Sequence, residues 1–108
     1  MITFQEKVWQ ATAMIPKGQV NTYGLIARAI KKPLASRAVG QALHCNPHWP
    51  QVPCHRVVRG TGEVGGFAGG SKKKIALLRQ EGIEIDNERL VNLKDYLYSF
   101  DNRRIRLL

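Results

Sequence analysis

The chain has 108 residues, 44% of them apolar and 23% charged, which is the composition of one folded domain and not of a disordered segment. Its 17 Lys and Arg against 8 Asp and Glu give a net charge of +9. No apolar run is long enough for a membrane helix, and the first residues lack the basic-then-apolar layout of a signal peptide. We therefore expect an intracellular protein with reduced cysteines and no membrane partner, cytoplasmic and close to the nucleoid, or nuclear in a eukaryote.

The basic residues are concentrated in one part of the chain. Between Lys7 and Gly62 there is no acidic residue, although the same stretch holds eight Lys and Arg. A surface of one sign is costly unless a partner neutralises it, and the usual partner is the phosphate backbone of a nucleic acid. The alternative is a basic surface that only keeps the chain soluble.

Three helices are predicted in the first 45 residues. A capping-box pattern at 3–6 begins a helix that Pro16 ends. Thr22 and Ser36 are placed to cap a second and a third helix, with Pro33 between them. Two short helices joined by about four residues are typical of a helix-turn-helix.

The outer face of the third helix carries small side chains. Ala35, Ala38 and Gly40 alternate there with Arg37 and Gln41. Such a helix can approach a nucleic-acid groove closely, but it offers few donors for base edges. This favours binding that tolerates many sequences.

The second half of the chain begins with loops. Residues 46–70 combine turn signals, a short predicted strand and many glycines. Ser71 is placed to cap a further helix, which Gly82 ends. Apolar residues on both sides of Asp86-Asn87 predict a small hairpin, and the basic tail at 103–106 is expected to be mobile.

The segment Pro53-Cys54-His55-Arg56 holds the reactive groups of the chain. A thiol attacks only as thiolate, and a neighbouring imidazole and a cationic field both favour that form. Adjacent residues of an extended chain point to opposite sides, so adjacency alone does not pair Cys54 with His55. These observations leave two roles open for Cys54, a reactive thiol and a buried structural cysteine.

The same region also contains potential metal ligands. Five potential zinc ligands lie within twelve residues, but the last two are adjacent, and adjacent residues rarely bind one tetrahedral ion: His44, Cys45, His48, Cys54 and His55. We expect no metal and no cofactor, and no Cys45–Cys54 disulfide in a reducing compartment. A plain helix-turn-helix regulator would carry more base-reading side chains on its third helix.

Six blocks of sequence, in order over about residues 4–82, resemble the O6-alkylguanine-DNA alkyltransferases, also called methylated-DNA–protein-cysteine methyltransferases. The blocks are Tyr23-Gly24-Leu25-Ile26-Ala27, Ser36-Arg37-Ala38-Val39-Gly40, Asn46-Pro47, Pro53-Cys54-His55-Arg56-Val57, Gly65-Gly66-Phe67-Ala68-Gly69-Gly70 and Leu77-Leu78-Arg79-Gln80-Glu81-Gly82. The resemblance implies a mainly α fold with small β elements, a winged-helix-like helix-turn-helix domain. It also implies single-turnover repair of O6-alkylguanine in double-stranded DNA.

The resemblance assigns three catalytic roles. Cys54 matches the thiol that takes the alkyl group from guanine O6, and His55 matches the base that draws the thiol proton through a water. Glu81 matches the carboxylate that orients the histidine. This is the arrangement of nucleophile, base and orienting group in another setting.

Further roles concern DNA and the lesion. Tyr23 matches the residue that helps to turn out the nucleotide, Arg37 the finger that fills the gap, and Asn46 the hinge before the active-site loop. Ser36 and Gln41 are expected to contact DNA from the third helix, which family members insert in the minor groove. The expected alkyl pocket consists of Leu43, Val57, Phe67, Ala68 and Gly69.

The short chain also resembles the alkyltransferase-like proteins, which bind O6-alkylguanine without repairing it and pass the lesion to nucleotide excision repair. That group typically lacks the acceptor cysteine, whereas this chain keeps Cys54, His55 and Glu81. Full alkyltransferases usually carry an additional N-terminal domain. We therefore expect one monomeric domain over residues 1–108, with the family-like core at about 4–82 and an extension at 83–108, acting as a minimal alkyltransferase, and we keep the lesion sensor as the alternative.

Overall fold

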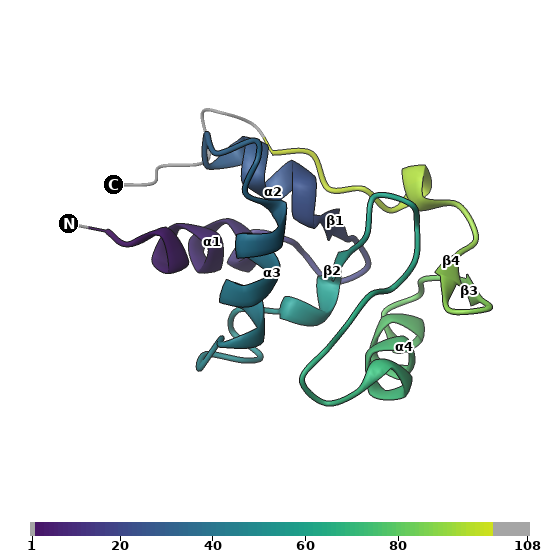
Figure 1. Ribbon diagram of the computed structural model, residues 1–108. Coiled ribbons are helices and arrows are strands. Elements are labelled where there is room, and N and C mark those ends of the chain that lie inside the picture. The colour runs from purple at the N-terminus through teal and green to yellow at the C-terminus, as the bar shows by residue number, and fades with distance from the viewer. Residues whose placement is uncertain (1, 101–108) are drawn as a thin grey trace.

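A computed structural model describes residues 2–100, so the expectation for the tail at 103–106 lies outside the described residues. Its longest regular elements are four helices: α1 (Phe4–Ala13), α2 (Tyr23–Ala29), α3 (Ser36–His44) and α4 (Ser71–Gln80). Two pairs of short strands accompany them: β1 (Asn21–Thr22) with β2 (Val57–Val58), and β3 (Ile85–Asp86) with β4 (Arg89–Leu90). Short 3-10 turns lie at Cys54–Arg56 and Leu93–Asp95. The prediction of a mainly helical fold with small β elements is confirmed (Figure 1).

The first two helices begin where the sequence predicts. Thr3 and Glu6 form the capping box of α1, with the Glu6 amide 3.1 Å from the Thr3 hydroxyl. The Thr22 hydroxyl accepts the Leu25 amide at 3.1 Å and caps α2. These bonds satisfy amides that have no partner inside their own helix.

The caps predicted for α3 and α4 were wrong. Ser36 and Ser71 are the first residues inside these helices, and their side chains make no capping bond. Ala35 and Gly70 stand at the cap positions, where Gly70 has a φ of 96° that a residue with a side chain rarely adopts. The turn of the helix-turn-helix is also longer than expected, because six residues (30–35) separate α2 from α3.

Two apolar clusters meet at the parallel strand pair. The first lies among α1, α2 and α3, and the second joins α4 to the β3–β4 hairpin. Successive side chains of a strand point to opposite faces. Val57 therefore packs into the first cluster and its neighbour Val58 into the second, both fully buried. This strand connects the helical half to α4, and the turn that carries Cys54 comes directly before it (Figure 1).

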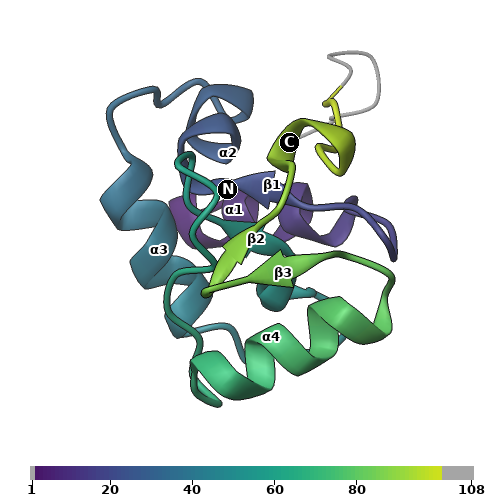
Figure 2. The same ribbon diagram turned by 90° about the vertical axis from the view of Figure 1, so that its right-hand side faces the viewer.

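The segment after α4 completes the second cluster and then returns to the first half. Ile83, Ile85 and Leu90 are buried in the second cluster. The Val20 amide donates to the Tyr96 carbonyl, and the Tyr98 amide donates to the Val20 carbonyl, both at 2.8 Å. Figure 2 shows this returning segment passing beside β1. Within residues 2–100, no helix has the length and apolarity that crossing a membrane requires.

Candidate active site and DNA-binding surface

Cys54 opens a 3-10 turn between α3 and β2. The turn is held by two bonds at 2.9 Å, from the Cys54 amide to the Val52 carbonyl and from the Arg56 amide to the Pro53 carbonyl. The thiol is half-buried and packs against the three-helix cluster. Because the backbone is turned here and not extended, the alternation of an extended chain does not govern where Cys54 and His55 point.

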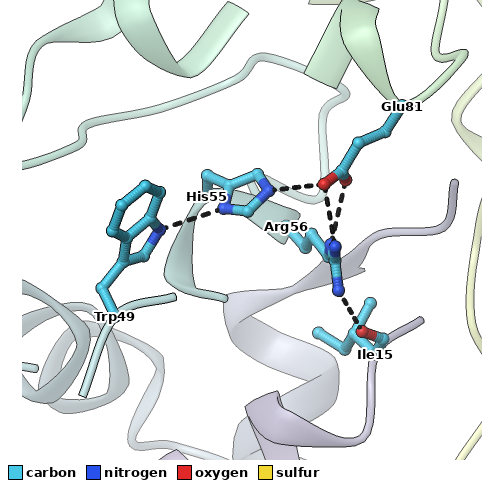
Figure 3. Close-up of polar contacts among 5 residues, drawn as sticks. All are labelled: Ile15, Trp49, His55, Arg56 and Glu81. Atoms are coloured by element: carbon cyan, nitrogen blue, oxygen red, sulfur yellow. Dashed lines mark hydrogen bonds and ion pairs between the residues drawn. The ribbon is translucent and has the colours of Figure 1, made fainter. Parts of the chain in front are cut away.

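His55 is buried and contacts a carboxylate from the end of α4. Its Nε2 lies 3.0 Å from Glu81 Oε2, although 26 positions separate the two residues. Glu81 is the C-terminal cap residue of α4, and Gly82 beyond it has a φ of 92° and ends the helix. The end of α4 thus places the carboxylate beside the Cys54 turn (Figure 3).

Arg56 holds the other side of the same carboxylate. Its Nε and one terminal nitrogen donate to Glu81 at 2.9 and 2.8 Å, and the other terminal nitrogen donates to the Ile15 carbonyl at 2.8 Å (Figure 3). Arg56 therefore ties the segment after α1, the Cys54 turn and the end of α4 together. It is not free to contact phosphate, contrary to the expectation for the basic stretch. Its partner lies 25 positions away, and sequence spacing gave no signal for that pairing.

Trp49 contacts the second ring nitrogen of His55. The indole Nε1 lies 3.3 Å from His55 Nδ1 (Figure 3). An indole N–H only donates, and a carboxylate only accepts. The two partners therefore fix the neutral tautomer of His55: Nε2 carries the hydrogen and faces Glu81, and Nδ1 presents its lone pair to Trp49.

Lys74 is a buried cation that the sequence interpretation missed. Its side chain is fully buried, and Nζ donates to the Val57 carbonyl at 2.7 Å, the Gly66 carbonyl at 3.0 Å and the Tyr23 hydroxyl at 3.4 Å. The sequence analysis assigned no role to the run of three lysines at 72–74. The spacing held the signal, since Lys74 lies one turn before the buried Leu78 and so on the inner face of α4.

The ionisation of the thiol follows from its surroundings. Burial raises the pKa of Cys54, opposed by a hydrogen bond from Asn46 and by the charge of Lys74. The lowering expected from neighbouring cations does not prevail in the free protein, so Cys54 rests as a thiol and requires a base. Burial also lowers the pKa of Lys74, to about 7.

Burial and the carboxylate act in opposite directions on the imidazole. Burial lowers the pKa of His55, and Glu81 only partly offsets this, so the ring is neutral and able to accept a proton. Burial also opposes ionisation of Glu81, but hydrogen bonds from Arg56 and His55 outweigh it and hold the pKa of Glu81 below its usual value. A neutral imidazole beside an ionised carboxylate is the arrangement that a general base requires.

Asn46 fixes the loop between α3 and the Cys54 turn. Its side-chain amide donates to the Val52 carbonyl at 2.8 Å, and its Oδ1 accepts the His48 amide at 2.9 Å. These two contacts join the end of α3 to the segment that leads into the reactive turn. The residue predicted as a hinge lies at the junction of these two elements.

A groove of about 660 Å³ lies between the helix-turn-helix and the glycine-rich loop. Arg59 and Gly66 line it, and so do three residues predicted to bind DNA: Tyr23, Ser36 and Arg37. Gln41 is exposed on α3 but does not line the groove. The Tyr23 ring packs close to the chain, because a Cβ at Gly65 would lie 3.2 Å from its hydroxyl.

The residues predicted to form the alkyl pocket lie in two different places, the buried three-helix cluster and the glycine-rich loop. Leu43 and Val57 are buried in the three-helix cluster, against which Cys54 packs. The Phe67 ring lies 6.5 Å from His55, whereas Ala68 and Gly69 are exposed on the loop beyond it. The described residues contain no group of three His, Cys, Asp or Glu side chains placed to hold a metal ion.

A helix-turn-helix with a groove beside it is the architecture of a DNA-binding domain, and this one carries a half-buried thiol in the same turn as the histidine of a His55–Glu81 pair. The chain belongs to the family described as 6-O-methylguanine DNA methyltransferase, DNA binding domain, which matches residues 3–83. The resemblance in sequence is thereby confirmed.

Curated relatives and solved structures agree with this family. A methylated-DNA–protein-cysteine methyltransferase of Salmonella typhimurium is 51% identical over 79 residues, 73% of this chain and 46% of the relative. The chain thus matches about half the length of such curated relatives. Mycobacterium tuberculosis OGT in complex with DNA is 46% identical with a TM-score of 0.72, over 75% of this chain and 50% of that one. S. pombe Atl1 in complex with damaged DNA containing O6-carboxymethylguanine is 36% identical with a TM-score of 0.77, over 92% of this chain and 99% of that one.

Proposed function

We propose that the chain repairs DNA by moving the alkyl group of an O6-alkylguanine to Cys54 in a single irreversible step. The observation that carries the proposal is a half-buried Cys54 thiol in the same 3-10 turn as a buried imidazole, whose Nε2 is hydrogen-bonded to Glu81. A chain whose cysteine served only for packing would not need this pair beside it. Methylated-DNA–protein-cysteine methyltransferase is the name of several curated relatives.

The residues act in sequence on one proton and one alkyl group. The Cys54 proton passes through a water to His55 Nδ1, because Nε2 already carries a hydrogen that faces Glu81. The thiolate attacks the alkyl carbon, a carbon–sulfur bond forms and the bond from that carbon to O6 breaks. The guanine keeps the electron pair of the broken bond and takes up one proton, so that a thioether and an ordinary guanine result. The thiol is consumed, and each molecule acts once.

The groove supplies the second requirement, which is access to a base. The O6 substituent cannot reach a half-buried thiol while the guanine is stacked, so the nucleotide must turn out of the duplex. Tyr23 and Arg37 line the groove, and we assign them the turning of the nucleotide and the filling of the gap. Lys74 donates to the Tyr23 hydroxyl, which strengthens that hydroxyl as a donor to the extruded base. Ser36 and Gln41 are proposed to contact the backbone of the duplex.

A lesion sensor is the second candidate, and one observation favours it. The likeness to S. pombe Atl1 extends over 99% of that chain, a protein solved with DNA that contains O6-carboxymethylguanine. In that case the chain would bind the lesion without transfer and hand it to nucleotide excision repair. The Cys54 thiol and its His55–Glu81 pair favour transfer.

The remaining features of the proposal concern organisation and partners. We propose one alkyltransferase-type domain in which residues 83–100 act structurally, since they close the second cluster and bond to Val20. The partner is double-stranded DNA, bound by a monomer in the compartment that holds the DNA.

The test is a transfer assay with a duplex that carries one O6-methylguanine labelled on its methyl group. We expect label to move to protein up to one equivalent and then to stop, because the thiol is not regenerated. The matched variant Cys54→Ser should bind the duplex but take no label. Binding by the intact chain without any transfer would favour the sensor.

A further inference from the structure

We propose that Trp49 acts as a gate on His55, the general base. Its indole N–H occupies the His55 nitrogen that must receive the thiol proton, and an entering lesion displaces the indole. The inference rests on the proposed function and deepens it by coupling activation of the thiol to occupation of the site. Trp49 would then be a positioning residue, since it acts through His55 and not on the alkyl group.

The hydrogen-bonding capacity of His55 leaves one nitrogen for base chemistry. Nε2 carries a hydrogen bonded to Glu81 at 3.0 Å, so the thiol proton has to be taken by Nδ1. That atom is the acceptor of the Trp49 N–H at 3.3 Å. A lone pair directed at an indole hydrogen cannot at the same time take a proton from a water, so the two states exclude each other.

The contacts of Trp49 allow it to move. It lies on the loop between α3 and the Cys54 turn, and it is 39% exposed, unusual for such a large apolar side chain. Its ring makes edge contacts with His55 at 6.2 Å and Phe67 at 6.4 Å, and Lys73 Nζ lies 5.6 Å above it. Such edge and cation–π contacts are individually weak, and a stacked nucleobase can replace them.

The surrounding charges make the gate effective. Glu81, Arg56 and Lys74 face His55, and Lys74 and Asn46 face Cys54. With Trp49 in place, the site holds a neutral imidazole that cannot act and a thiol that burial keeps protonated. When Trp49 leaves, Nδ1 is free to take the proton, and Lys74 remains to stabilise the thiolate. The single-use thiol is thereby protected from small electrophiles until a lesion is bound.

The first test measures thiol reactivity without DNA, so that it does not depend on repair activity. Iodoacetamide is the probe, in a Cys45→Ser background because Cys45 is a second free thiol and is more exposed than Cys54. Trp49→Phe keeps a ring but removes the N–H and should raise the rate at Cys54 about threefold to tenfold near neutral pH, the range that one hydrogen bond supports. The matched control Trp9→Phe removes an indole that donates to the Ala42 carbonyl and should leave the rate unchanged.

The pH profile separates a gate from simple shielding. A freed base lowers the pH midpoint of the Cys54 reaction in Trp49→Phe, whereas better access alone raises the rate equally at every pH. A shifted midpoint supports the gate. An unshifted midpoint, or a rate at or below that of the unmodified chain, overturns it, whatever the DNA transfer assay shows.

The second test observes the indole itself. The chain has two tryptophans, so Trp9→Phe leaves Trp49 as the sole emitter, and Cys54→Ser prevents transfer. We expect a duplex with O6-methylguanine to change Trp49 emission far more than the same duplex with guanine, because only the lesion occupies the site and moves the ring away from His55. Equal changes with both duplexes overturn the gate.

Discussion

Glu81→Gln changes the group that links His55, Arg56 and α4. Glu81 accepts three hydrogen bonds, two at Oε2 and one at Oε1, and a glutamine can place only one oxygen there. At least one donor of Arg56 or His55 then faces an amide N–H, and the negative charge beside Arg56 is lost. The side chains of Arg56 and Glu81 are only 17% and 12% exposed, so water replaces the lost bonds poorly. A charged hydrogen bond of this kind is worth about 1.5–3 kcal/mol, and breaking a buried pair costs about 3–5 kcal/mol, so we expect a loss of about 3 kcal/mol.

Urea unfolding followed by circular dichroism measures this loss. Glu84→Gln is the matched control, because Glu84 is exposed and its carboxylate makes none of these bonds. The pKa of Glu81 is held below its usual value, so its contribution is complete only well above the ordinary glutamate pKa of about 4.3 and disappears as the pH falls through the folded-state pKa. The gap between the unmodified chain and Glu81→Gln should therefore close in acid. A loss below about 0.5 kcal/mol at neutral pH would refute the reasoning, since that is the range of ordinary surface changes.

Three further predictions concern the buried lysine and the DNA surface. The pKa of Lys74 is lowered to about 7, so between pH 7 and the ordinary lysine pKa of about 10.4 the unfolded chain binds one proton more than the folded chain. The free energy of unfolding should therefore rise over that interval by up to about 1.4 kcal/mol per pH unit. Lys74→Met should lack this rise in unfolding curves, and an identical pH dependence would contradict it. Arg37→Ala should weaken binding of the lesion duplex about tenfold in a fluorescence titration, and the exposed Lys94→Ala less than about threefold; equal losses would exclude the finger role. Affinity should fall about a hundredfold between about 50 and 200 mM salt if roughly four phosphates are contacted, and a flat response would count against the basic face.

Local signals in the sequence predicted most of the helical framework. The capping box at Thr3 and the helix stop at Gly82 reflect bonds and backbone angles within a few residues, so pattern alone identified them. Ser36 and Ser71 misled because serine suits a cap position but also the first turn of a helix. The structure places both serines in the first turn, after Ala35 and Gly70 at the cap positions.

The site shows where sequence pattern stops being informative. The family resemblance named Cys54, His55 and Glu81, whereas composition and spacing alone left Cys54 undecided. Arg56 was counted with the basic stretch and Lys74 was given no role, because only the approach of α4 to the Cys54 turn gives them buried partners. Long-range pairing of this kind depends on the tertiary fold, which the local pattern of one sequence does not reveal.

The central claim is that one sulfur atom accepts the alkyl group. Its most direct measurement is peptide mass analysis of the chain after incubation with a duplex that carries O6-methylguanine. We predict a gain of about 14 Da, one methyl in place of one hydrogen, on the peptide that holds Cys54, with the peptide of Cys45 unchanged. A bound lesion with both cysteine peptides at their original mass, or a gain at Cys45 alone, would contradict it.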